Sequence, residues 1–360
     1  MPTDYVKNCG LQLEKLRDKE DITILAIESS CDETACAITR GRKVLSSVIA
    51  SQIEIHKRYG GVVPEIASRN HVMAISQITS EALERAGLKP ENIDCVAVTY
   101  GAGLLGALLV GVSFAKAYAY ALNKPLVAVN HIRGHVAANY LADPQLKPPY
   151  ICLIASGGHT AVVKVDDYED LKLLGSTQDD ACGEAFDKVA RVLGLPYPGG
   201  PEIQKLAKEG KPSVHLPTPL RNSEGYDFSY SGLKTAVINY VHTKEQKGEG
   251  FSKADVACSF QEKAVEIMTD AAVRAAEDNG IKTVVIAGGV AANERLREVM
   301  RQKAEKRGFK VYYPPLGLCT DNAAMIASEA YNLIRSGAKP ADITLDASAT
   351  VKITDVSPRA

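Results

Sequence analysis

Two histidines stand four residues apart in the segment His131-Ile132-Arg133-Gly134-His135. The residues that follow favour a helix, and helix positions i and i+4 lie on one face, so both imidazoles can reach one metal ion. Two histidines that meet without a metal are the alternative, and the spacing alone does not separate the two. A zinc protease of the HExxH type requires glutamate where this chain has Ile132, so that hydrolytic chemistry lacks its general base.

Asp321 is the best candidate for a third metal ligand, because it stands at the polar start of the apolar stretch 318–325. Its alternative role is to cap the helix that this stretch predicts. Two histidines and one carboxylate leave coordination positions open, which is typical of a site that binds substrate rather than of a closed structural site. Both iron(II) and zinc suit this set of ligands.

Short apolar runs separated by polar or glycine-rich turns predict the strands that position these residues. Residues 22–27 and 35–38 flank the turn 28–34, and residues 150–155 and 161–165 flank the turn 156–160. Two similar strand-turn-strand units therefore open two halves of the chain. Further strands are predicted at 93–99, 126–130 and 283–287, and helices after Gly106, over 183–193 and over 294–307.

A glycine-rich loop, 288–293, joins the last of these strands to the helix that follows it. Such a loop exposes backbone N–H groups to a nucleotide or phosphate, and the helix dipole favours an anion there. A tight turn with only a packing role is the alternative for any one loop. Three such loops in two repeated halves indicate an α/β fold of the duplicated actin-like ATPase type (ASKHA, the actin, Hsp70 and sugar-kinase superfamily), with a central cleft.

The length of 360 residues suits two domains. We predict an N-terminal extension at 1–20, an N-terminal actin-like subdomain at 21–130 and a C-terminal actin-like subdomain at 131–330. Residues 331–360 form a C-terminal helix and tail that can return to the first subdomain.

The composition excludes several classes of protein. Hydrophobic residues make up 46% of the chain and charged residues 24%, as in ordinary soluble proteins, and the net charge of −1 gives no overall field that attracts nucleic acid. The most apolar windows are broken by glycine and shorter than the ~20 residues that cross a bilayer. The N-terminus lacks the apolar core of a secretory signal, and the eight cysteines contain no CxxC pair. We therefore expect a cytoplasmic protein with reduced cysteines and no membrane association.

Seven motifs, ordered along residues 22–353, resemble those of the bacterial tRNA N6-adenosine threonylcarbamoyltransferase family. They are Glu28-Ser-Ser-Cys-Asp-Glu-Thr34, His131-x-x-x-His135, Ser156-Gly-Gly-His-Thr160, Gly183-Glu-Ala-Phe-Asp187, Tyr197-Pro-Gly-Gly200, Gly288-Gly-Val-Ala-Ala-Asn293 and Cys319-Thr-Asp-Asn322. The resemblance implies an actin-like fold and an acyltransferase-type, metal-dependent enzyme. Its reaction would move the threonylcarbamoyl group from threonylcarbamoyl-AMP to N6 of the adenosine 3′ to the anticodon, in tRNAs reading codons that begin with A.

The same resemblance implies partners, a metal and site residues. The partners are tRNA, the proteins TsaB and TsaE, and a separate synthase that supplies the adenylate. His131, His135 and Asp321 match the ligands of one divalent metal ion, Fe(2+) or Zn(2+). The substrate-contacting positions match Ile154, Ala155, Ser156, Gly157, Gly158, Asp187, Gly200 and Asn293.

Threonylcarbamoyl-AMP is already activated, so the protein must mainly orient it and stabilise charge on its carbonyl oxygen. The amides of 156–158 would hold the phosphate, the 288–293 loop would face the nucleoside, and Asp187 would accept the ribose hydroxyls. A proton lost by the amine would pass to one of three carboxylates, and the sequence leaves the choice open: Glu28, Asp32 or Glu33. An ATP-hydrolysing or phosphotransferring enzyme of the same fold and a nucleotide-binding scaffold with dispensable histidines are the alternatives.

Overall fold

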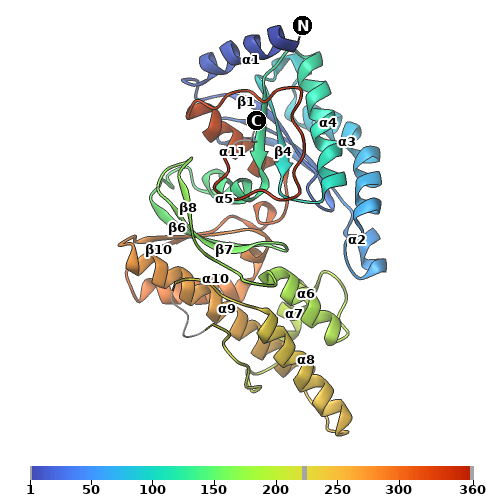
Figure 1. The fold of residues 1–360 in the computed structure, drawn as a ribbon, viewed down its shortest axis with the longest axis vertical. Coiled ribbons are helices and arrows are strands. Elements are labelled where there is room, and N and C mark those ends of the chain that lie inside the picture. Colours follow the sequence, from blue (N-terminus) through green and yellow to red (C-terminus); the bar gives the residue numbers. More distant parts are fainter. Residues whose placement is uncertain (1, 221–224, 357–360) are drawn as a thin grey trace.

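The computed structural model describes residues 2–220 and 225–356. Two five-stranded sheets lie one above the other in Figure 1 and share one strand order: β3-β2-β1-β4-β5 in the first and β8-β7-β6-β9-β10 in the second. In each sheet the opening hairpin is antiparallel, and the fourth strand in sequence pairs in parallel with the first. This repeat confirms the predicted duplicated α/β fold.

The first sheet contains β1 (Thr23–Glu28), β2 (Glu33–Arg40), β3 (Lys43–Ser51), β4 (Cys95–Gly101) and β5 (Leu126–Asn130). β1, β4 and β5 are buried along their whole length. Elements cover both faces of the sheet, which explains why these strands read as unbroken apolar runs. The strands predicted at 22–27, 35–38, 93–99 and 126–130 are confirmed.

The second sheet contains β6 (Tyr150–Ala155), β7 (Thr160–Val165), β8 (Leu171–Ser176), β9 (Thr283–Ala287) and β10 (Lys310–Tyr312). β6 and β7 form the second antiparallel hairpin, and β9 pairs with β6 in parallel. The strands predicted at 150–155, 161–165 and 283–287 are confirmed.

The helices are α1 (Pro2–Leu16), α2 (Ile53–His56), α3 (Pro64–Ala86), α4 (Leu105–Ala121), α5 (His131–Ala142), α6 (Cys182–Val192), α7 (Gly199–Ala207), α8 (Ser231–Gln246), α9 (Lys253–Asp278), α10 (Glu294–Glu305) and α11 (Ala323–Arg335). Short 3-10 turns are η1 (Lys57–Tyr59), η2 (Pro90–Asn92), η3 (Gly289–Ala292) and η4 (Leu316–Leu318). The helices predicted after Gly106, over 183–193 and over 294–307 are α4, α6 and α10. Within the described residues, none of the helices combines the length and the apolar character that crossing a membrane requires.

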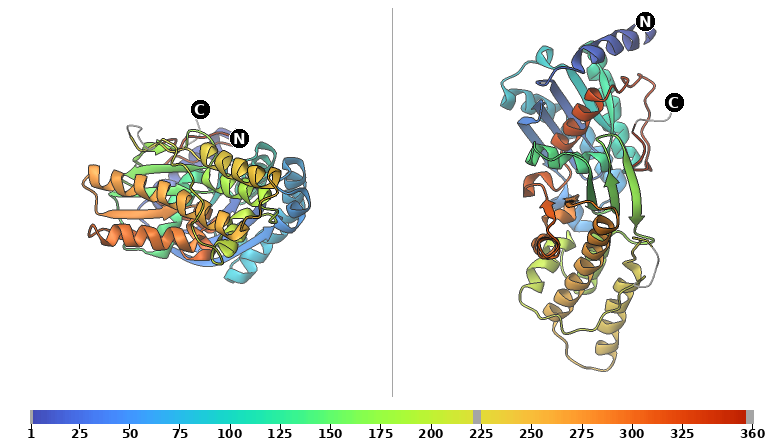
Figure 2. Two further views of the ribbon diagram at one scale, coloured as in Figure 1. Left: turned by 90° about the horizontal axis from the view of Figure 1, so that it is seen from below. Right: turned by 90° about the vertical axis from the view of Figure 1, so that its left-hand side faces the viewer.

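Helices cover both faces of each sheet. α3 and α4 pack on one face of the first sheet, and α1 and α11 pack on the other. The second sheet carries α6 to α10 on one face and α5 on the other. Figures 1 and 2 show α8 and α9 extending from the second sheet in the direction away from the first.

α5 and α11 are exchanged between the two halves. α5 follows the first sheet in sequence, but most of its apolar side chains pack on the second sheet, while Ala138 and Leu141 pack with α11 against the first. α11 follows the second sheet and packs on the first. The two helices approach each other closely at Gly134, where a Cβ atom would lie 2.8 Å from Cδ1 of Ile326. Glycine at this position therefore lets α5 and α11 pack side by side.

The segment after α11 runs back along the first sheet. The amide of Ala341 donates to the carbonyl of Leu126, and the amide of Ser348 donates to that of Tyr100. Leu345 and Val351 join the core between this sheet, α3 and α4. The predicted boundary between 330 and 331 falls inside α11, and residues 1 and 357–360 of the predicted extension and tail lie outside the described residues. The division into domains stays a prediction.

Candidate active site

His131, His135 and Asp321 come together where α5 meets the start of α11. The two imidazole rings are 4.7 Å apart, and Oδ1 of Asp321 lies 3.6 Å from Nε2 of His131 and 3.2 Å from Nε2 of His135. One potential ligand atom from each residue lies within 4.8 Å of the other two. The helical i and i+4 spacing therefore places both imidazoles beside one carboxylate, as the sequence predicted.

The surroundings of His135 suit a metal ion. Both of its ring nitrogens are buried, and neither forms a hydrogen bond of normal geometry with any described residue, although Asp321 is close. A buried polar atom without a partner costs about 1–3 kcal/mol, so a ligand that takes the Nε2 lone pair would remove that cost. Two imidazoles and a carboxylate are donors that iron(II) and zinc accept.

Asp321 is free to act as a ligand because its neighbour performs the capping role. Oδ1 of Asn322 accepts a hydrogen bond from the amide of Met325, so Asn322 is the N-cap of α11. The alternative role of Asp321 as the helix cap is therefore wrong. Its side chain is 23% exposed, which leaves one side of the triad open to a substrate.

Glu28 contacts the Nδ1 atom of His131, whereas Asp321 lies near the other ring nitrogen, Nε2. Oε2 of Glu28 accepts from Oγ1 of Thr99 and lies 3.1 Å from Nδ1 of His131, while Oε1 accepts from the amide of Ser30 at 2.6 Å. This carboxylate favours the proton on Nδ1 and leaves Nε2 directed at Asp321. Burial alone would lower the pKa of His131, but Asp321 and Glu28 together raise it to about 9. Metal binding at Nε2 must therefore displace a proton.

Asp32 and Glu33 lie at the turn of the first hairpin. Oε1 of Glu33 accepts from the hydroxyl of Ser51 at 2.8 Å, whereas Oε2 is buried and has no hydrogen-bond partner among the described residues. Burial raises the pKa of Glu33 to about 7, and it also raises the pKa of Asp32. Of the three predicted carboxylates, Glu33 thus has one oxygen without a hydrogen-bond partner among the described residues and a pKa near neutrality.

The turn of the second hairpin presents two glycines to open space. The amide of Ser156 donates to the carbonyl of His159 at 2.8 Å, which closes the turn. A Cβ atom at Gly157 or Gly158 would meet nothing within 4 Å. By contrast, a Cβ atom at Gly183, at the start of α6, would lie 2.8 Å from Cα of Gly157, so the two segments are in contact. The exposed side of this turn can therefore accept a ligand close to its backbone.

Two further glycines line open space in the same half of the molecule. A Cβ atom would meet nothing within 4 Å at Gly200, the second residue of α7, or at Gly289, which follows β9. The preceding residue Gly288 has φ of 91° and lies against the backbone of Ala155, so it shapes the turn. Bare backbone at Gly200 and Gly289 would let a ligand approach these two loops closely.

Asp187 and Asn293 already have protein partners. Oδ1 of Asp187 accepts from the amide of Gly199 at 2.7 Å, and burial raises the pKa of this carboxyl. Oδ1 of Asn293 caps α10 through the amide of Leu296, and its Nδ2 donates to Oε1 of Gln261. Each side chain thus fixes its own loop, and a contact with substrate would add to that role.

Ile154 and Ala155 are fully buried in β6. The side chain of Ile154 packs towards α5, and that of Ala155 packs into the core under α6 and α9. Only backbone atoms of these two residues can therefore take part in ligand binding without opening the core.

Two residues near the predicted site, His159 and Tyr197, were not predicted from the sequence as site residues. Burial lowers the pKa of His159 to about 4, and the nearby His131 and His135 act in the same direction, which places His159 beside the triad. Burial raises the pKa of Tyr197, and the carboxylates of Asp32 and Asp187 add to the effect, so Tyr197 lies near both. Both residues belong to the motifs quoted above, but nothing in their spacing separates them from turn residues.

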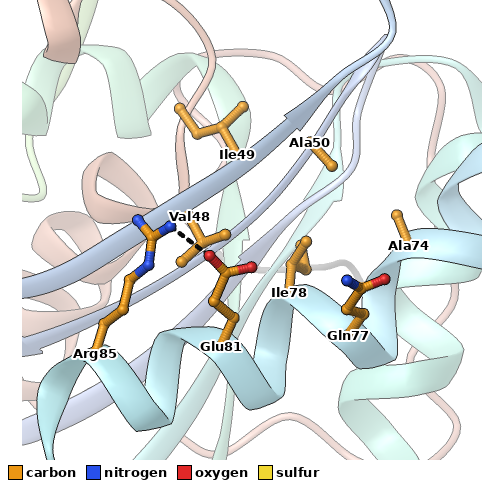
Figure 3. A pocket seen from close by; sticks show the side chains of 8 residues that line it. All are labelled: Val48, Ile49, Ala50, Ala74, Gln77, Ile78, Glu81 and Arg85. Atoms are coloured by element: carbon orange, nitrogen blue, oxygen red, sulfur yellow. Dashed lines mark hydrogen bonds and ion pairs between the residues drawn. The ribbon is translucent and has the colours of Figure 1, made fainter.

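A separate pocket of about 250 Å³ lies between the edge strand β3 and α3 (Figure 3). Its lining comprises Val48, Ile49, Ala50, Ala74, Gln77, Ile78, Glu81 and Arg85. Glu81 and Arg85, one turn apart on α3, form an ion pair in its lining. The lining includes none of the predicted site residues, so the pocket is not part of the candidate active site.

Comparison with known proteins supports the sequence motifs. The family model TsaD, tRNA N6-adenosine threonylcarbamoyltransferase, matches residues 43–328. A tRNA N6-adenosine threonylcarbamoyltransferase of Clostridium perfringens (strain SM101) is 55% identical over 310 residues, which cover 86% of this chain and 91% of that protein. The enzyme of the same name from Clostridium botulinum (strain Hall) is 52% identical over 315 residues, or 87% and 93%.

Solved structures share the fold at low identity. Full-length HypF in its phosphate- and nucleotide-bound form is 16% identical and has a TM-score of 0.60. This match covers 88% of this chain and 47% of HypF. Component A of the (R)-2-hydroxyglutaryl-CoA dehydratase of Acidaminococcus fermentans is also 16% identical and has a TM-score of 0.52. This match covers 87% of this chain and 99% of component A. These likenesses bear out the actin-like ATPase fold.

Proposed function

Since the chain belongs to the TsaD family of tRNA N6-adenosine threonylcarbamoyltransferases, we propose that the site around His131, His135 and Asp321 holds threonylcarbamoyl-AMP against a metal ion for transfer to tRNA. The enzyme forms threonylcarbamoyladenosine, t6A, by moving the threonylcarbamoyl group to N6 of the adenosine 3′ to the anticodon in tRNAs reading codons that begin with A. Relatives at 52–55% identity carry this name, which displaces the phosphotransferring enzyme and the nucleotide scaffold as alternatives.

His131, His135 and Asp321 would hold one divalent ion, iron(II) or zinc, which would act as a Lewis acid towards oxygens of the threonylcarbamoyl group. The observation that carries this assignment is that both ring nitrogens of His135 are buried without a hydrogen bond to the described residues, while Oδ1 of Asp321 lies 3.2 Å from Nε2. Glu28 keeps His131 in the tautomer and ring orientation that leave Nε2 available.

The glycine backbones would bind the adenylate. Space is open where a Cβ atom would stand at Gly157 and Gly158, so a phosphate can approach this turn and accept from its backbone amides, and the bare backbone at Gly289 and Gly200 leaves room for the nucleoside. Asp187, with its second oxygen, can accept from ribose hydroxyls. Held in this way, the carbamoyl carbon is presented to the incoming amine without a further activation step.

In the transfer step, the N6 amine of tRNA attacks the carbamoyl carbon, the bond from that carbon to the phosphate oxygen breaks, and AMP leaves. The amine loses one proton, for which we propose Glu33 as the acceptor. Its Oε2 has no partner among the described residues, and its pKa of about 7 suits a general base at neutral pH. Glu28 is less suited, because both of its oxygens are already bound.

Protein partners are the second part of the proposal. The relatives' names imply tRNA as the substrate; TsaB, TsaE and a separate synthase for the adenylate are our proposal. Four large apolar side chains on α3 and α4 support a partner contact: Val72, Met73, Leu105 and Leu109 are 61, 80, 48 and 41% exposed. A Cβ atom at Gly106 would lie 2.6 Å from Oγ of Ser68, so the two helices lie side by side here. We call these four residues the α3/α4 patch; exposed apolar patches of this kind commonly mark protein interfaces.

Transfer of label tests the proposal directly. The purified chain, TsaB, TsaE, ATP and tRNA are mixed with threonylcarbamoyl-AMP that carries label in its threonyl group, and the digested tRNA is separated into nucleosides. We expect label in t6A and release of one AMP per t6A formed. Release of AMP with the label free in solution would show hydrolysis in place of transfer.

A further inference from the structure

Arg133 lies between the two histidines in sequence but on the other side of α5. A residue two positions from another on an α-helix is rotated by about 200°, so the Arg133 side chain leaves the face opposite the histidine pair. The side chain is 1% exposed, which makes it one of the largest fully buried side chains of the described residues. A buried arginine requires acceptors for its N–H groups, and those acceptors show what it connects.

Three separate segments supply the acceptors of Arg133. Nε donates to Oε1 of Glu329 on α11 at 2.6 Å. Nη2 donates to the carbonyl of Tyr168 at 2.8 Å and Nη1 to that of Glu169 at 3.3 Å, both in the turn between β7 and β8. Nη1 also donates to the carbonyl of Ile353, in the segment that returns along the first sheet.

The ion pair with Glu329 joins the two elements that supply the proposed metal ligands. His131 and His135 lie on α5, and Asp321 directly precedes α11, which carries Glu329 at its middle. Glu329 is 3% exposed, so both charges are removed from water. Such a pair contributes little net stability compared with apolar side chains of similar volume, and its fixed geometry is the property that apolar packing would not reproduce.

Asn130, the N-cap of α5, makes a second connection to the returning segment. Its Oδ1 accepts from the amide of Ile132, and its Nδ2 donates to the carbonyls of Lys352 at 2.8 Å and Asp355 at 3.3 Å. With Arg133, the first turn of α5 thus binds three carbonyls of the segment 352–355. These hydrogen bonds fix the turn of α5 that carries His131 at two points: at the N-cap Asn130, and through Arg133 on the opposite face of the helix.

We propose that Arg133 is a positioning residue for the metal centre: through Glu329 and the backbone carbonyls it fixes the distance between the histidine pair and Asp321. The inference rests on the proposed metal site. It predicts that loss of the Arg133–Glu329 pair weakens metal binding even when the fold is intact, because the ligands then sample a wider range of separations.

The test uses a double variant, since removal of one partner alone would leave a buried charge unpaired. Arg133→Met with Glu329→Leu replaces both charges by apolar groups in the full-length chain. The matched control is Arg295→Met with Glu262→Leu, which removes a bidentate pair between α10 and α9, elements that carry none of the proposed ligands. Folding is checked by circular dichroism and thermal unfolding before each measurement.

Metal affinity is measured by calorimetry with Zn²⁺, and ligand geometry by the visible absorption of Co²⁺. We expect Arg133→Met/Glu329→Leu to bind Zn²⁺ about tenfold more weakly than the parent and to change the Co²⁺ spectrum, while the control pair leaves both unchanged. Arg133→Lys keeps the positive charge but lacks the planar guanidinium with its several N–H donors. We therefore expect a loss of Zn²⁺ affinity between that of the parent and that of the double variant. Arg133→Lys also keeps the test open if the double variant does not fold.

Unchanged Zn²⁺ affinity and Co²⁺ absorption in the folded double variant, or an equal loss in the control, would overturn the positioning role. His135→Ala, measured alongside, separates this failure from failure of the metal site itself. If His135→Ala binds Zn²⁺ as the parent does, the site assignment is wrong; if it loses the metal while the double variant keeps it, only the role of Arg133 is wrong.

Discussion

The buried carboxyl of Glu33 links the stability of the fold to pH. Burial raises its pKa from 4.5 to about 7, so the folded state disfavours the charged form. The stability associated with its neutral form is fully present below pH 4.5 and is lost as the pH rises through about 7. We therefore expect Glu33→Gln to unfold at the same temperature as the parent near pH 4.5 and at a higher temperature above pH 7. Thermal unfolding across this range measures the difference, and parallel curves for the two proteins would contradict it.

The same substitution tests Glu33 as the proton acceptor. The parent's rate of t6A formation should rise with pH through about 7, as the carboxylate forms. In Glu33→Gln this limb should disappear and the rate should fall, while bound metal stays unchanged. If the rate of t6A formation by Glu33→Gln still rises with pH through about 7, the group that titrates there is not Glu33.

His135 has a sharper test, because its ring nitrogens have no other described partner. His135→Ala should lose most of the bound metal, as measured by elemental analysis of the folded protein, and His131→Ala and Asp321→Ala should do the same. His242→Ala is the matched control, since His242 lies exposed on α8. Metal content in His135→Ala equal to that of the control would refute the site.

At the scale of elements, the loop after β9 contains two adjacent glycines with different environments. Gly288 has a positive φ and lies against Ala155, so Gly288→Val should destabilise the fold by about 1–3 kcal/mol. A Cβ atom at Gly289 meets nothing within 4 Å, so Gly289→Val should fold like the parent and bind the adenylate more weakly. Calorimetry with threonylcarbamoyl-AMP, or a stable analogue, compares the two. Equal affinity in folded Gly289→Val and the parent would make this loop a packing turn only.

The strands and the helix boundaries near the site could be predicted because local signals determine them. Apolar runs predicted both hairpins, and the i, i+4 spacing predicted the histidine pair. Position 321 shows the limit: Asp321 and Asn322 are both good N-caps, and only the folded backbone selects Asn322. The exchange of α5 and α11 depends on long-range packing at Gly134, and the role of Arg133 depends on a glutamate almost two hundred residues away, so neither could be predicted locally.

For the whole molecule, the α3/α4 patch predicts dependence on protein partners. The net charge of −1 gives the protein no strong electrostatic attraction for tRNA. We therefore expect the purified chain, with only threonylcarbamoyl-AMP added, to form little t6A in tRNA. Met73→Asp places a charge at the most exposed of the large apolar side chains among the described residues, and it should weaken partner binding about tenfold or more while the fold persists. Light scattering with TsaB and TsaE, alone and together, measures complex formation. Leu173→Asp, at an exposed leucine on β8 of the second sheet, is the control; equal partner binding by both variants would exclude this surface.

The exchange of α5 and α11 also sets an order of events during synthesis on the ribosome. The strands of the first sheet are complete at residue 130, but α11, which shares one of their faces with α1, ends at residue 335. The part of that face on which α11 packs, with its alanine and isoleucine side chains, therefore stays uncovered while the whole second sheet is being made, although α1 is already present on the same face. The last helix closes the first sheet and brings Asp321 to the histidines in the same movement. With the proposed ligands, a nascent chain would acquire its capacity for metal only when its two halves have joined, so metal occupancy would report completed assembly.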